Sequence, residues 1–104
     1  MMDYQLVIKF WRNSLDDEAF LPTLEARLAT AVGKSADLDG FDVSAKEINL
    51  FMNTAEPRPA FRRCKDVLEE MGVMHSVSAA YRLVGGAQFT SVWPQRMARK
   101  FTLP

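Results

Sequence analysis

The fold of this chain is decided by its central stretch, Glu47-Ile48-Asn49-Leu50-Phe51-Met52-Asn53. Its aliphatic residues stand at every second position, which is the spacing of a strand with one buried face. Residues 38–43 alternate more weakly, and Ser44-Ala45-Lys46 joins them to this strand, so the two segments predict a hairpin. The prolines in residues 54–59 then suit the first turn of a helix.

The same alternation identifies a strand at the start of the chain, over residues 4–11. Asn13-Ser14 then opens a helical segment that continues to Gly33, with Ser14 and Asp17 spaced like a capping box. Pro22 lies inside this segment and leaves two alternatives: a kinked helix, or a shorter helix with Pro22 in its first turn.

A second predicted helix carries an apolar stripe and ends at Gly72, and residues 76–84 and 88–93 form a second hairpin around Gly85-Gly86. The predicted order is therefore β-α-β-β-α-β-β, in which two amphipathic helices cover one face of an antiparallel sheet. This is an α+β, ferredoxin-like arrangement with an extra strand. We expect one such domain over residues 1–94 and a basic C-terminal tail over residues 95–104.

The composition is that of an ordinary globular domain, with 104 residues, 48% hydrophobic and 25% charged, and a formal net charge of zero. Residues 1–56 carry ten acids against five bases, and residues 57–104 carry eight bases against three acids. If the two halves fold together, their charges interleave in space, which explains this uneven distribution of charge more simply than binding to a polyanion does. No apolar run approaches the ~20 residues of a membrane span and no signal peptide is visible, so we expect a soluble, cytoplasmic protein.

The residue types argue against most familiar chemistries. The chain has one cysteine, Cys64, and one histidine, His75, and neither stands in a metal-ligand spacing. The acidic run 37–42 resembles a calcium loop, but its glycine comes too early, and Ile48 occupies the position where the loop needs a glutamate. We therefore expect no metal, no cofactor and no catalytic residue.

Asp39-Gly40 indicates a turn or a distorted strand in the first arm of the central hairpin. Asp42 follows directly, and we expect its carboxylate to accept backbone hydrogen bonds of the hairpin. On the other arm Asn49 is the residue that Asp42 faces as a polar pair. This interpretation makes Asp42 a structural residue.

One face of the predicted sheet is left uncovered by the helices, and we call it the open face. This face combines aromatic with basic side chains, and as a whole it is too apolar to be merely solvated. Such a surface is typical of a dimer or partner interface. We therefore predict a non-catalytic interaction or regulatory domain that binds a protein partner, or itself as a homodimer, through this face or a sheet edge. The alternative is that the C-terminal tail folds back over the face. The candidate face residues are Val7, Lys9, Trp11, Asn49, Phe51, Asn53 and Arg82.

A second hypothesis is a cofactor-free enzyme or small-molecule-binding protein with a pocket between the sheet and the helices. Such pockets combine an apolar cavity with a few polar groups. The candidate pocket residues are Asp42, Asn49, His75, Tyr81 and Trp93.

Nucleic acid is the obvious rival partner, because RNA-recognition domains use a similar sheet with exposed aromatic residues. The strand 47–53 lacks the basic-glycine-aromatic pattern of those domains, and the zero net charge removes the main electrostatic contribution to affinity. The second helix carries Arg58, Arg62 and Lys65, but Arg62–Asp66 and Lys65–Glu69 have the spacing of weak ion pairs on a solvated face.

Three motifs carry a resemblance to a known group: Asp39-Gly40-Phe41-Asp42, Glu47-Ile48-Asn49-Leu50-Phe51 and Phe89-Thr90-Ser91-Val92-Trp93-Pro94. They resemble small bacterial proteins of unknown function that pair an Asp-Gly-x-Asp hairpin with a Glu-x-Asn-aliphatic-Phe strand and end in a Phe-Thr-x-x-Trp-Pro strand. This chain departs from the group in having Val43-Ser44-Ala45-Lys46 where a glycine-rich turn is usual. The resemblance implies a bacterial, cytoplasmic protein and transfers no activity.

Overall fold

The computed structural model describes residues 2–15, 18–94 and 100–104. Within these residues the chain forms five strands and two α-helices. Short 3-10 turns follow some of these elements, and the turns η1 (Arg12–Ser14) and η3 (Met74–Ser76) are used below. The main elements are β1 (Tyr4–Trp11), α1 (Leu21–Val32), β2 (Ala36–Val43), β3 (Glu47–Thr54), α2 (Pro57–Glu70), β4 (Val77–Leu83) and β5 (Thr90–Trp93).

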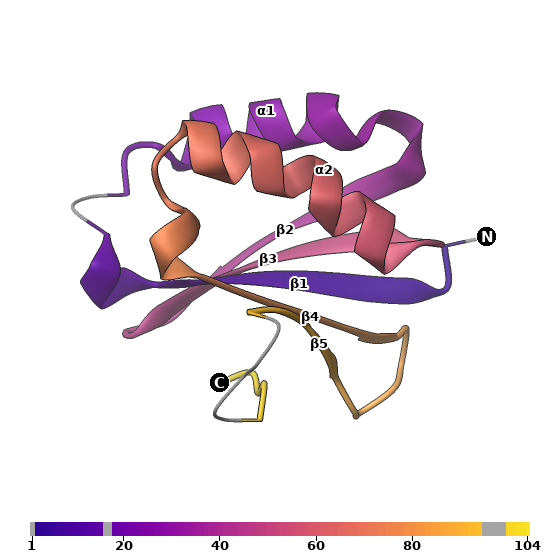
Figure 1. The fold of residues 1–104 in the computed structure, drawn as a ribbon. Coiled ribbons are helices and arrows are strands. Elements are labelled where there is room, and N and C mark those ends of the chain that lie inside the picture. The colour runs from indigo at the N-terminus through magenta and orange to yellow at the C-terminus, as the bar shows by residue number, and fades with distance from the viewer. Residues whose placement is uncertain (1, 16–17, 95–99) are drawn as a thin grey trace.

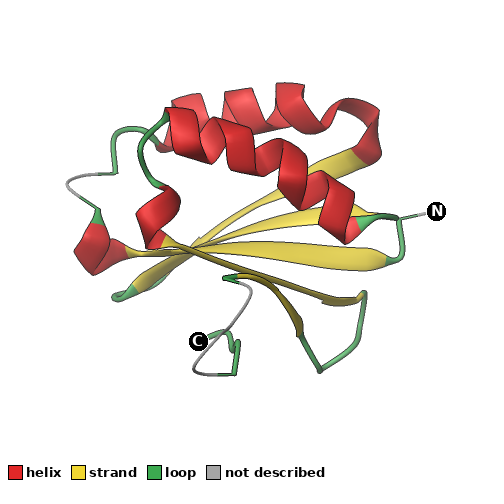
Figure 2. Ribbon diagram, viewed as in Figure 1, coloured by secondary structure: helices red, strands yellow, loops and turns green. Residues whose placement is uncertain are grey.

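The sheet has the strand order β2-β3-β1-β4-β5, and all neighbouring strands run antiparallel. Both α-helices lie on the same side of it, as Figure 1 shows by element and Figure 2 by colour. The predicted α+β class, the antiparallel sheet and the two helices are confirmed. The fifth strand makes the order differ from a simple ferredoxin fold.

The core lies between the sheet and the helices. Leu6 is opposite Met52 and Ile8 is opposite Leu50 in the β1–β3 register, and all four side chains are buried. Burying one such side chain contributes roughly 1.5–3 kcal/mol, so this layer supplies most of the stability. The helices complete it with Leu24, Leu28, Val32, Phe61, Cys64 and Leu68.

Helix α1 is the shorter of the two alternatives, with Pro22 in its first turn, where a missing N–H costs nothing. The predicted cap at Ser14 is wrong, because Ser14 lies in the turn η1 and Phe20 precedes α1 without a side-chain cap. Asp17, the other half of the predicted capping box, lies outside the described residues. Gly33 ends the helix as predicted, with a φ of 54° that favours glycine.

The edge strand β2 contains the distortion that Asp39-Gly40 predicts. Its register with β3 shifts between Leu38 and Phe41, and Gly40 has a φ of 91°. Three exposed aspartates along β2, Asp37, Asp39 and Asp42, put like charges on this edge. A charged, bulged edge resists pairing with the same edge of another copy.

The predicted structural role of Asp42 is wrong. Asp42 does pair with Asn49 in the register, but its side chain is exposed and has no hydrogen bond in the described structure. Ser44 closes the hairpin instead: its Oγ donates to the Glu47 carbonyl over 3.0 Å and accepts from the Glu47 N–H over 3.3 Å. A hydroxyl can do both at once, whereas a carboxylate can only accept.

The second hairpin, β4 to β5, is confirmed, although both strands are shorter than predicted. The Gly86 N–H donates to the Leu83 carbonyl over 2.8 Å at the turn. Across the described part of the chain, no helix has the length and apolar character needed to cross a membrane.

Candidate functional site on the open face

The predicted face residues do share the side of the sheet that carries no helix. Lys9 is opposite Asn49 in the β1–β3 register, and Val7 is opposite both Phe51 in β3 and Ala80 in β4. Further along, Gln5 pairs with Asn53 on one side and with Arg82 on the other. The alternation of the sequence therefore placed these side chains correctly.

The centre of this face is covered by residues 100–104, which we call the C-terminal segment. It lies below the sheet in Figure 1, opposite the helices. Phe101 is only 5% exposed and packs with Val7 and Ala80, and Leu103 joins the edge of the same cluster. The alternative prediction, that the C-terminal tail folds back over the open face, is thus correct for residues 100–104.

Phe101 lies within a row of cations and aromatic rings that crosses the open face. The Arg82 guanidinium carbon lies 4.7 Å from the centre of the Phe89 ring, and the Phe89 and Phe101 ring centres are 4.9 Å apart. The Lys9 ammonium follows at 4.5 Å from Phe101 and 4.9 Å from the Trp11 ring. Cations over ring faces and tilted ring pairs are both attractive geometries. Phe101 is therefore held in its slot by ring and cation contacts that an aliphatic side chain would not make.

Lys9 is the polar centre of the site. It is 3% exposed, its Nζ lies 3.1 Å from Glu47 Oε2, and it donates to the Thr102 carbonyl over 2.5 Å. A buried ammonium is tolerated only when it is paired and hydrogen-bonded, and here one of the two partners is the backbone of the C-terminal segment. Lys9 thus contacts both the Phe101 ring and the main chain of the C-terminal segment.

Asn49 supports this centre from β3. It is fully buried, and its Nδ2 donates to Glu47 Oε2 over 2.8 Å, which fixes the carboxylate beside Lys9. Its Oδ1 has no hydrogen-bond partner among the residues described. A buried acceptor without a partner costs about 1–3 kcal/mol, and such costs are concentrated at functional sites.

A cavity of about 180 Å³ remains beside Lys9 under the C-terminal segment. Trp11, which is 43% exposed, closes one side and donates from its Nε1 to Ser78 Oγ over 3.3 Å. The space is small beside the about 300–1,000 Å³ of ordinary ligand pockets. The cavity lining comprises Lys9, Trp11, Glu47, Ser78, Lys100, Phe101 and Thr102.

Of the candidate pocket residues, only Asp42 and Asn49 are neighbours, opposite each other in the β2–β3 register, and the other three lie apart. His75 is exposed, and its Nε2 donates to the Ser14 carbonyl over 2.9 Å. Tyr81 stacks edge-on against Tyr4 at 5.5 Å, and Trp93 lies 6.4 Å from the ring of Phe61. The cavities at His75, Tyr81 and Trp93 are three separate ones.

Cys64 is an inert core residue. Burial between the helices and the sheet raises the pKa of its thiol from 9.0 to about 12, so the reactive thiolate does not form at neutral pH. Within the ranges 2–15, 18–94 and 100–104, no three His, Cys, Asp or Glu side chains group closely enough to hold a metal ion.

The sequence interpretation missed Glu47 as a member of the site, and it gave the C-terminal segment only as an alternative cover for the face. The signal for the segment was present, because Phe101 and Leu103 flank Thr102 with the period of two of an extended chain on an apolar face. Glu47 begins β3 on the same side as Asn49, which the alternation also indicates. Comparison of the chain with protein-family models, with curated proteins and with solved structures gives no significant match.

Proposed function

We propose that this protein is a non-catalytic interaction domain whose open face binds an extended chain segment anchored by a phenylalanine. The proposed occupant is the C-terminal segment of a second copy, so that two copies exchange these segments and form a homodimer. The observation that carries the proposal is Phe101, held between Phe89 and Lys9 while Lys9 also binds the Thr102 carbonyl.

The balance of energies supports exchange. Burying Phe101 contributes roughly 1.5–3 kcal/mol, and a hydrogen bond from a charged group about 1.5–3 kcal/mol. Fixing the backbone costs about 1–2 kcal/mol for each of five residues, which exceeds these two gains. The ring and cation contacts of Phe101 bring the balance near zero. A segment held so weakly leaves its slot readily, and a vacant slot exposes Lys9 and two aromatic rings.

A second copy is the occupant best matched to this slot, because every copy carries both the slot and the segment. Exchange keeps all the contacts of the single chain and adds whatever surface the two copies bury together. The β2 edges, with their three exposed aspartates, are poorly suited to pair with each other, which favours the open face as the contact.

We further propose that the domain is ferredoxin-like, with β5 as an addition at the edge. This is supported by the central position of β1 between β3 and β4, and by the two helices on one face. Bacterial origin and a cytoplasmic location are proposals that rest on the resemblance of the three sequence motifs.

Sedimentation velocity of the full chain against concentration tests the exchange. We expect a dimer fraction that rises with concentration up to about 1 mM, the affinity range of a short segment. Phe101→Ala should lower the dimer association constant at least about tenfold, since each of the two exchanged contacts loses roughly 1.4 kcal/mol or more while the single chain, whose segment is close to balance, loses less. Leu83→Ala is the matched control, because Leu83 is 58% exposed, lies outside the slot and should have no effect.

The sign of the Phe101→Ala effect separates exchange from simple docking of two open faces. A vacant slot would strengthen docking, because the segment no longer covers the apolar side chains around Val7 and Ala80. The same vacancy weakens exchange, because the exchanged segment has lost its anchor. A more dimeric Phe101→Ala variant, or a wild-type chain that stays monomeric at every concentration, contradicts the proposal.

A further inference from the structure

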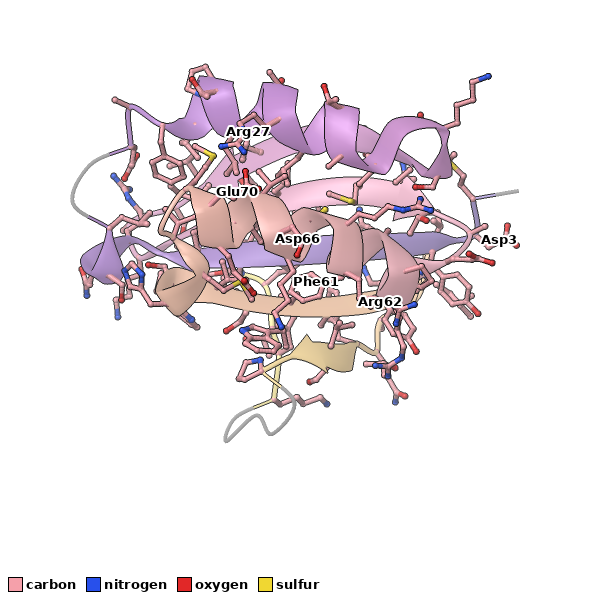
Figure 3. All side chains as sticks on the ribbon, turned by 45° about the horizontal axis from the view of Figure 1, so that its top comes forward. Asp3, Arg27, Phe61, Arg62, Asp66 and Glu70 are labelled. Carbon is pink, nitrogen blue, oxygen red and sulfur yellow. The ribbon has the colours of Figure 1, made fainter. Side chains whose placement is uncertain are left out.

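A second groove lies on the other side of the sheet, between α2 and the edge strand β5. It encloses about 240 Å³. Figure 3 shows Phe61 and Arg62 on the part of α2 nearer to β5, whereas Arg27 and Glu70 meet between the two helices. The groove shares no residue with the open-face site, and its lining comprises Arg58, Phe61, Arg62, Lys65, Val92 and Trp93.

The groove holds three cations on one side of α2, at spacings of four and three residues, so their side chains point the same way. Lys65 Nζ lies 3.7 Å from Glu69 Oε1, a long contact with an exposed partner. The predicted pair of Arg62 with Asp66 is absent from the described ion pairs, and neither Arg58 nor Arg62 has a carboxylate within 4.0 Å there. The charges of Arg58 and Arg62 are therefore not neutralised by an ion pair with any described residue.

Aromatic rings hold two of these cations in place. The Arg58 guanidinium carbon lies 5.6 Å from the centre of the Tyr81 ring, and Lys65 Nζ lies 4.4 Å from the centre of the Trp93 ring. A ring face positions a cation without taking up its N–H donors, which carboxylates would do. Arg58 and Lys65 are thus preorganised and keep donors for another partner.

The order of charges along α2 opposes the helix dipole. Arg58 stands in the first turn and Glu69 and Glu70 in the last, the reverse of the arrangement that a helix dipole favours. This arrangement lowers the stability of the helix. An anion bound among the arginines of the groove would relieve that repulsion.

We propose that the α2–β5 groove binds a small phosphate-bearing molecule. Two guanidinium groups and an ammonium offer more donors than one carboxylate accepts, and they suit the three terminal oxygens and double charge of a phosphomonoester. Phe61, Val92 and Trp93 give the groove an apolar wall for the organic part of the ligand. The volume lies below the about 300–1,000 Å³ of ordinary ligand pockets, which favours a small ligand.

Titration of the full chain with phenyl phosphate tests the groove, because this probe combines a phosphomonoester with one ring. We expect saturable binding by calorimetry, and at least tenfold weaker binding in Arg62→Gln and in Arg58→Gln. Arg63→Gln is the matched control, because Arg63 is also an exposed α2 residue but does not line the groove. It removes the same charge and should leave the affinity unchanged, and thermal melting confirms that all three variants fold.

Several results would overturn this proposal. Equal losses in Arg62→Gln and Arg63→Gln would mean general attraction to charge, as would equal binding of phenyl phosphate and inorganic sulfate. Tighter binding of a single-stranded oligonucleotide than of phenyl phosphate would assign the groove to nucleic acid instead. Absence of saturation by about 10 mM phenyl phosphate would remove the site.

Discussion

The two faces of the sheet are closed in opposite ways. The helix-covered face joins two amphipathic helices to the strands β1 to β4 through a continuous hydrophobic core, in which Leu50, Ile8 and Leu28 are fully buried. The open face is closed by the five residues of the C-terminal segment, which cover a charged centre formed by Lys9 and Glu47. The first face therefore holds the domain together, and the second carries a short segment over a polar site, which we propose is exchanged between copies.

The two faces differ in the kind of interaction that closes them. Close packing of apolar side chains makes the helix-covered face sensitive to any change of volume. The open face depends on a few directional contacts with a short segment, and our proposal is that this face releases and rebinds that segment.

The largest effect is expected in the aliphatic core. Leu50→Ala should lower the free energy of unfolding by about 2–5 kcal/mol, because it leaves a cavity between β3 and the helices. Chemical denaturation measures this loss. A cost below about 1 kcal/mol would show that the two faces do not differ as described.

The charged centre of the open face comes next. Glu47→Gln should cost about 3 kcal/mol, the low end for a buried pair, since the Glu47 side chain is 13% exposed. The loss arises because Lys9 is left buried without its counter-charge. The double variant Lys9→Met, Glu47→Gln should recover part of the loss, and a double variant less stable than Glu47→Gln alone would contradict this account.

Removing the anchor of the C-terminal segment should cost less. Phe101→Ala should lower the free energy of unfolding by about 1–2 kcal/mol, below the about 3–5 kcal/mol of a core Phe→Ala, because the segment detaches instead of leaving a cavity. Denaturation of the wild type and the variant at equal low concentration checks this. A loss as large as that of Leu50→Ala would make the segment part of the core.

The pH dependence of stability probes how tightly the helix-covered face excludes water. The folded pKa of Cys64, about 12, lies above its ordinary 9.0, so its contribution is complete below pH 9 and is lost as the pH rises toward 12. We expect the wild type to lose about 1 kcal/mol more than Cys64→Ala between pH 8 and pH 10. Identical pH profiles would mean that the thiol is not desolvated.

The smallest effect is expected at Asp42. Because its side chain is exposed and lacks a hydrogen bond in the described structure, Asp42→Ala should change stability by less than about 0.5 kcal/mol. Ser44→Ala is the sharper test of the same hairpin and should cost about 1 kcal/mol, since two hydrogen bonds are lost. A larger loss for Asp42→Ala than for Ser44→Ala would reverse the assignment.

Local pattern predicted the elements and the faces well, because alternation and helical spacing depend on residues that are close in sequence. It placed Lys9 and Phe51 on the open face and indicated the distortion at Gly40. It missed the burial of Lys9, because the partner carbonyl of Thr102 comes from 93 positions away. It misassigned Asp42 because Asp and Ser both favour turns, and only the geometry of residues 44–47 distinguishes them.

We propose above that the open face of one copy binds the C-terminal segment of a second copy. The most direct measurement is an NMR titration of isotope-labelled, full-length Phe101→Ala with an unlabelled peptide of residues 95–104. We predict saturable shifts at Val7, Phe51 and Ala80, none at the core residue Leu28, and none with a peptide that itself carries Phe101→Ala. Shifts that are absent, that are the same for both peptides, or that map to the helix-covered face would contradict the claim.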